Sequence, residues 1–162
     1  LDVSHGSVYR HFPSKASLRE AVAKRWLDRL SAPLLKIAEA SGPAPARLDK
    51  GLRTMFAIKH ERLGDDPEMF ATYLTLAREA CKAVNCHKDC LVDQIVKILS
   101  DGVEQGLFQV TDVKVTALAI FDATSRFHHP GHAEEWSDPG TPARIDAVLA
   151  LLLKGLEAPR KR

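Results

Sequence analysis

Hydrophobic residues recur every three or four positions along most of the chain, a spacing that predicts α-helices. The first long helix is predicted over residues 15–40, with a stripe made of Leu18, Val22, Trp26, Leu30, Leu34 and Ile37. Pro33 falls inside this helix and should kink or divide it, because proline has no N–H and its ring clashes with the preceding turn. The run Ser41-Gly42-Pro43-Ala44-Pro45 predicts that the helix then stops.

The remaining chain continues the helical pattern, with Asn85 expected to cap the central helix and Gly106 expected to end it. Further helices are predicted over residues 46–63, 68–81, 91–103, 111–127 and 142–156. No segment alternates with a period of two, as a strand would. The sequence therefore predicts an all-α fold.

A short helix is predicted near the start, over residues 5–12, between the capping residue Ser4 and the helix breaker Pro13. Val8 and Phe12 lie four positions apart on one face, so both side chains can pack this helix against a hydrophobic core. The other faces carry hydroxyl, imidazole, phenol and guanidinium groups, with almost no carboxylate. Such donors suit phosphate oxygens and base edges in a DNA major groove.

The run Val3-Ser4-x-Gly6-Ser7-Val8-Tyr9-x-His11-Phe12-Pro13-Ser14-Lys15-x-x-Leu18 resembles the second half of the helix-turn-helix of the TetR family of bacterial transcriptional repressors. The resemblance implies a TetR-like fold in two parts. Residues 1–40 would be the remainder of the DNA-binding head, and residues 41–162 a helical domain for effector binding and dimerisation. It also implies two helices before the motif, where only Leu1 and Asp2 stand, so we expect a chain truncated within the helix-turn-helix.

The resemblance implies that Tyr9, His11 and Lys15 hold DNA phosphates. The residues expected to approach the DNA backbone or the groove floor are Ser4, His5, Gly6, Ser7 and Arg10. Of these, Arg10 is the one expected to read guanine through two hydrogen bonds. The alternative is that Tyr9 and His11 only border a small core.

The resemblance further implies a pocket for a small, largely apolar effector within the helical body. Residues that would bring polar tips and aromatic walls to it are Phe56, His60, Tyr73, Phe121, Ser125 and His128. Trp136 is expected to cap this pocket or to cross to a second subunit. Each of these residues has the alternative of being a core residue.

The last two helices carry little charge, and the resemblance implies that they form a four-helix bundle with the same pair from a second subunit. The expected homodimer interface consists of Phe121, Ile145, Val148, Leu149, Leu152 and Leu156. A two-fold dimer would also space two recognition helices for a palindromic double-stranded DNA operator. The alternative is that both helices are packed inside one chain.

Composition and charge fit this prediction without deciding it. The 162 residues are 45% hydrophobic and 27% charged, an ordinary soluble composition. No apolar run approaches the ~20 residues that cross a bilayer, so a cytoplasmic protein without a membrane partner is expected. The net charge is +2, and residues 1–29 hold six basic and three acidic residues, which concentrates positive charge near the predicted DNA helix.

Two other classes of function are possible readings of the sequence, a sensor domain and an enzyme. Cys81, Cys86 and Cys90, with His87 among them, suggest a metal or thiol sensor, but no C-x-x-C is present, so neither metal nor cofactor is expected. No phosphate loop, nucleophile elbow or H-E-x-x-H occurs, which argues against an enzyme. The hypothesis is a TetR-like repressor released by an effector. The alternative is a helical protein-interaction or redox- or metal-sensing domain without DNA binding.

Overall fold

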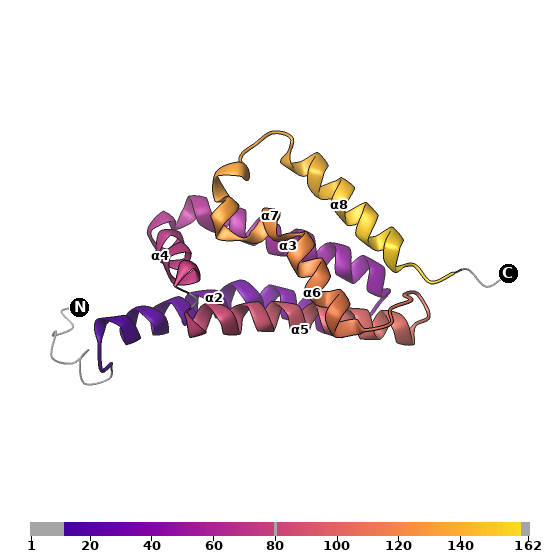
Figure 1. The fold of residues 1–162 in the computed structure, drawn as a ribbon, viewed down its shortest axis with the longest axis horizontal. Helices are drawn as coiled ribbons and strands as arrows, with labels where there is room; N and C mark the ends of the chain where they lie inside the picture. The colour runs from indigo at the N-terminus through magenta and orange to yellow at the C-terminus, as the bar shows by residue number, and fades with distance from the viewer. Residues whose placement is uncertain (1–11, 80, 160–162) are drawn as a thin grey trace.

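The computed structural model of the chain describes residues 12–79 and 81–159. Its helices are α2 (Lys15–Glu39), α3 (Ala44–Asp65), α4 (Pro67–Arg78), α5 (Lys82–Glu104), α6 (Val113–Ala123), α7 (Ser125–His128), the 3₁₀ helix η1 (Pro130–Glu135) and α8 (Thr141–Leu156) (Figure 1). Within the described ranges there is no β-strand, and Phe108 and Glu157 form an isolated bridge. The predicted all-α fold is confirmed.

Helix α2 begins with a capping box, in which the Ser14 and Ser17 side chains each accept a hydrogen bond from the other residue's backbone N–H. It runs without a break past the exposed Pro33, so the predicted division does not occur. Val22 is exposed, so the predicted apolar stripe is wrong there. The buried residue at that level is Ala23, whose small side chain packs against α4.

Helices α2 and α5 lie side by side along most of their length, and α3 packs against both (Figure 1). The main core lies between them and includes Leu48, Leu52, Leu91, Ile95 and Leu99. A second apolar cluster lies where the first half of α2 meets α4, and it consists of Ala23, Leu27, Leu30, Phe70, Tyr73, Leu76, Val84 and Trp136. The molecule is therefore packed around two clusters along α2.

Helix α5 begins nine residues earlier than the sequence pattern predicted, at Lys82, with Cys81 in the capping position. Asn85 therefore lies inside the helix, and its predicted role as a cap is wrong. Ala83, Val84 and His87 are buried on one face of this first part. The hydrophobic pattern did not reveal this buried face, because His87, one of its three residues, is polar.

The end of α5 is fixed by two glycines. Gly106 has a φ of +69°, and its N–H and that of Leu107 donate to the carbonyls of Val103 and Gly102. This is the Schellman arrangement, so the predicted helix end at Gly106 is confirmed. Gly102 is needed for space, since a Cβ there would lie 2.1 Å from Cδ2 of Phe108.

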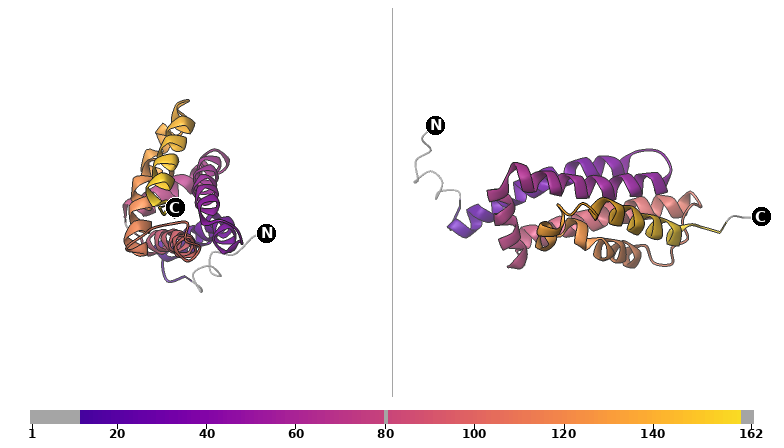
Figure 2. Two further views of the ribbon diagram at one scale, coloured as in Figure 1. Left: turned by 90° about the vertical axis from the view of Figure 1, so that its right-hand side faces the viewer. Right: turned by 90° about the horizontal axis from the view of Figure 1, so that it is seen from above.

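The C-terminal helices cover one side of the molecule. Asp112 caps α6 by accepting from the N–H of Val115. The predicted helix over residues 111–127 breaks at Thr124 into α6 and α7, and η1 then connects α7 to α8, the predicted last helix. Viewed end-on, α6, α7 and α8 lie opposite α3, with α5 below them (Figure 2). In the described part of the chain, no helix is both long and apolar enough to cross a membrane.

Candidate functional site

The predicted DNA contacts Ser4, His5, Gly6, Ser7, Tyr9, Arg10 and His11 lie outside the described residues. Lys15 is described, and it is the exposed first residue of α2, directly after the capping box at Ser14. Phe12 is half-buried. The DNA contacts therefore stay predictions.

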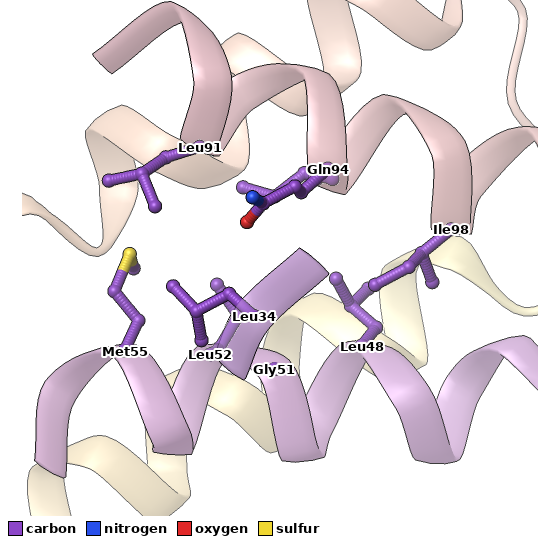
Figure 3. Close-up of a pocket in the computed structure, with 9 residues that line it drawn as sticks. Leu34, Leu48, Gly51, Leu52, Met55, Leu91, Gln94 and Ile98 are labelled. Atoms are coloured by element: carbon purple, nitrogen blue, oxygen red, sulfur yellow. The ribbon is translucent and has the colours of Figure 1, made fainter. Parts of the chain in front are cut away.

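A small apolar cavity lies between α2, α3 and α5 (Figure 3). Its walls are Leu34, Leu48, Gly51, Leu52, Met55, Leu91, Gln94, Ile95 and Ile98. The side-chain amide of Gln94 donates to Sγ of Cys90 at 3.5 Å. The cavity offers only 20 Å³, about the room of one water molecule, so a larger ligand would have to separate the helices.

Four polar side chains are buried next to this cavity, one from each of α2, α3, α4 and α5. Nζ of Lys59 donates to the hydroxyl oxygen of Tyr73 at 3.2 Å and lies 5.4 Å from the centre of its ring. Nδ1 of His87 lies 2.9 Å from Oγ of Ser31. The rings of Tyr73 and His87 meet edge to face, with centroids 6.4 Å apart. We call these four residues, Ser31, Lys59, Tyr73 and His87, the polar cluster.

Burial sets the charge of the histidines in this region. It lowers the pKa of His87 well below the usual value, and the charges of Lys59 and His128 lower it further. Burial, followed by Lys59, lowers the pKa of His128 to about 3. Both imidazoles are therefore neutral near pH 7.

A second, open groove lies between α3 and the start of α8, with a volume of 340 Å³. Its lining residues are Arg53, Phe56, Ala57, His60, Trp136, Thr141, Pro142, Ile145 and Asp146. The ring of His60 stacks on Trp136 with centroids 4.6 Å apart, and its Nε2 lies 3.1 Å from the carbonyl oxygen of Phe127. Arg53 closes one end by pairing with Asp146 at 2.6 Å.

The six predicted effector residues do not form one site. Phe56 and His60 line the open groove, while Tyr73 belongs to the polar cluster. Phe121 and His128 are core residues, with Nε2 of His128 held 3.0 Å from the carbonyl oxygen of Phe121. Ser125 is half-buried at the start of α7.

Trp136 is buried against α3 and α4, and its indole N–H donates to the carbonyl oxygen of Arg126. It borders the groove from within its own chain, so the expectation that it crosses to a second subunit is wrong for this structure. The polar members Ser31, Lys59 and His87 were absent from the predicted set. The sequence did contain a sign of their burial. Lys59 and His87 lie four positions from the core residues Met55 and Leu91, which places them on the same helix faces.

The predicted dimer residues lie mostly toward the core. Phe121, Leu149 and Leu156 are buried inside the chain, whereas Ile145, Val148 and Leu152 are half-buried against the core. The exposed apolar residues of these helices are Val115 and Leu118 on α6, six and three positions before Phe121, and Leu151 on α8, one position before Leu152. A one-residue step on a helix turns a side chain by about 100°, so the exposed apolar face of α8 differs from the predicted one.

The cysteines do not form a metal centre in the described part of the chain, where no group of three His, Cys, Asp or Glu side chains is arranged to hold an ion. Cys86 and Cys90 are exposed, and the thiol of Cys81 donates to Glu20 at 3.4 Å. Burial raises the pKa of the Cys90 thiol, which disfavours the reactive thiolate.

Comparison with known families identifies this arrangement of helices. A model of the tetracyclin repressor-like, C-terminal domain matches residues 44–149, from the start of α3 into α8. No curated protein matches the chain. The matched region holds three of the four members of the polar cluster and both sides of the open groove. It begins after the motif at residues 3–18 and is therefore independent of it. The chain belongs to the TetR family of regulators, and residues 44–149 are its tetracyclin repressor-like C-terminal domain.

Proposed function

We propose that the protein is a cytoplasmic transcriptional repressor that binds a palindromic operator as a homodimer and is released by a small-molecule effector. Residues 1–40 are assigned to the DNA-binding head and residues 41–162 to effector binding and dimerisation. The motif at residues 3–18 and the matching C-terminal domain support this assignment from two separate parts of the chain. Regulation, and not turnover of a substrate, is the expected activity.

The observation that carries the proposal is the continuity of α2. This helix begins at Lys15, inside the motif at residues 3–18, and reaches both the polar cluster through Ser31 and the cavity through Leu34. Nineteen residues of helix correspond to about 29 Å, so a small tilt at Leu34 displaces the Lys15 end by a larger amount. An effector needs to shift the balance between two tilts by only about 1–3 kcal/mol.

Dimerisation is proposed through the exposed apolar faces of α6 and α8. Val115, Leu118 and Ala119 form such a face on α6, and Ala147 and Leu151 form one on α8. Leu151 is 74% exposed in the single chain. Covering apolar surface is worth about 25 cal/mol per Å², which favours association of these faces with a second copy.

The test is an electrophoretic shift of the full-length gene product on the DNA upstream of its own gene. We expect a discrete shifted band that competitor DNA of unrelated sequence does not remove. Arg10→Ala should weaken this binding by about 10- to 100-fold and relax its sequence preference, whereas Lys15→Ala should weaken binding to all sequences alike. Equal affinity for the upstream and unrelated DNA would refute the proposal.

A further inference from the structure

The interior of the helical body contains an ammonium group without a counter-ion. Lys59 is 3% exposed, and in the described ranges no carboxylate lies within ion-pair distance of its Nζ. The hydroxyl of Tyr73 is its hydrogen-bonding partner there. A buried charge is unfavourable unless it is paired, so an anion that binds beside Lys59 would be stabilised by it.

Further donors surround this ammonium. His87 is 5% exposed, and its Nε2 has no hydrogen-bonding partner in the described part of the protein. The Ser31 hydroxyl has two acceptors within reach, Nδ1 of His87 at 2.9 Å and the carbonyl oxygen of Leu27 at 3.2 Å. When its single proton goes to the nearer one, Nδ1, the ring proton of His87 lies on Nε2, which is then a donor. The Tyr73 oxygen accepts from Lys59, which leaves its own proton available. Ammonium, phenol and imidazole thus offer three kinds of N–H or O–H donor from three helices.

The polar cluster lies one helical turn from the apolar cavity. Ser31 precedes the cavity residue Leu34 by three positions on α2, and Lys59 follows Met55 by four on α3. On α5, His87 precedes Leu91 by four positions. Residues at these spacings share a helix face, so the donors and the cavity walls form one continuous strip.

We propose that the effector is an amphipathic monocarboxylate, whose carboxylate binds Lys59, Tyr73 and His87 and whose apolar tail enters the cavity between α2, α3 and α5. This inference rests on the proposed function, in which a small molecule occupies the helical body. A neutral ligand would leave the ammonium unpaired, and a single negative charge balances it. Because the cavity offers only 20 Å³, the tail has to move α2 away from α3 and α5 as it enters.

The test compares octanoate with 1-octanol and octylamine, which share one apolar chain and differ in the charge of the head group. Binding is measured by calorimetry and by the shift in melting temperature, using the complete 162-residue chain. We expect octanoate to bind about 10- to 100-fold more tightly than 1-octanol, the worth of hydrogen bonds to a charged group, and octylamine to bind least. Equal binding of octanoate and 1-octanol would overturn the proposal.

Variants locate the site. Lys59→Met should abolish the preference for octanoate and raise the melting temperature of the free protein, because it removes an unpaired buried charge at similar volume. Lys50→Met, at an exposed position of the same helix, should keep the preference. Tyr73→Phe retains the ring and should weaken the binding of octanoate by up to about tenfold while leaving the binding of 1-octanol unchanged. Retained preference in Lys59→Met, or a lowered melting temperature, would overturn the assignment.

The outcome is separable from that of the proposed function. If 1-octanol or another neutral molecule releases the full-length protein from DNA and octanoate does not bind, the proposed repressor function is supported and the proposed carboxylate site is refuted. If octanoate binds through Lys59 and the full-length protein binds no specific DNA, the proposed carboxylate site is supported and the proposed repressor function is refuted.

Discussion

Nδ1 of His87 and Oγ of Ser31 are hydrogen-bonded across 2.9 Å, which joins α5 to α2 in the interior of the protein. Ser31→Ala should lower the free energy of unfolding by about 1–3 kcal/mol, because it leaves a buried ring nitrogen without a partner. Urea unfolding measures this loss. Ser41→Ala, in the exposed turn after α2, is the matched control and should stay within about 0.5 kcal/mol of the parent.

Gly102 should not tolerate a side chain. An alanine Cβ would lie 2.1 Å from the ring of Phe108, so Gly102→Ala should destabilise the protein by about 1–3 kcal/mol or more in thermal or urea unfolding. Gly155 lies in α8 with nothing within 4 Å of its Cβ position. Gly155→Ala should therefore leave stability unchanged or raise it by up to about 1 kcal/mol. Similar effects of the two substitutions would contradict the close approach of Phe108.

Acid should destabilise the fold through its buried histidines. The pKa of His128 is lowered from 6.5 to about 3, so the unfolded chain takes up a proton as the pH falls below 6.5 and the folded chain does not. Stability is thus full above pH 6.5 and falls toward pH 3, by roughly 1.4 kcal/mol per pH unit for one histidine. Urea unfolding between pH 7.5 and about 4.5 measures the slope. His128→Leu should flatten the slope, and an unchanged slope would count against a buried neutral His128.

The proposed dimer surface can be tested by charge. Leu118→Glu and Leu151→Glu each place a carboxylate on an exposed apolar face of α6 or α8, and each should convert the dimer to a monomer in sedimentation experiments. Leu35→Glu is the control, because this residue is also exposed but belongs to α2 and not to α6 or α8. A monomeric parent chain, or dimers in all three variants, would refute this surface.

The sequence predicted the number and order of the long helices well, because their apolar residues recur at helical spacing and proline or glycine marks most ends. It predicted less well which face is buried. At Val22 and Ala23 the larger apolar residue is exposed and the smaller one is packed, since the distance between α2 and α4 decides which side chain fits. The hydrophobic pattern of a sequence carries no information about the distance between two helices.

The candidate site was only partly accessible to sequence reasoning. Tyr73 was predicted because an aromatic ring with a polar tip suits a pocket, but Lys59 and His87 were not, because charged and polar residues are expected at the surface. Their burial follows from the meeting of four helices, which one sequence does not reveal. The adjacency of the polar cluster to the cavity likewise depends on how α3 crosses α2 and α5.

The unbroken course of α2 past Pro33 has a thermodynamic corollary. In the proposed function one helix joins the operator-binding end to the effector site, so the two ligands would compete for its orientation and their influence on each other would be reciprocal. The factor by which the effector lowers the affinity for operator DNA must equal the factor by which operator DNA lowers the affinity for the effector. Titrating the effector into the DNA-bound and the DNA-free protein should therefore return the same ratio of affinities as titrating DNA with and without effector.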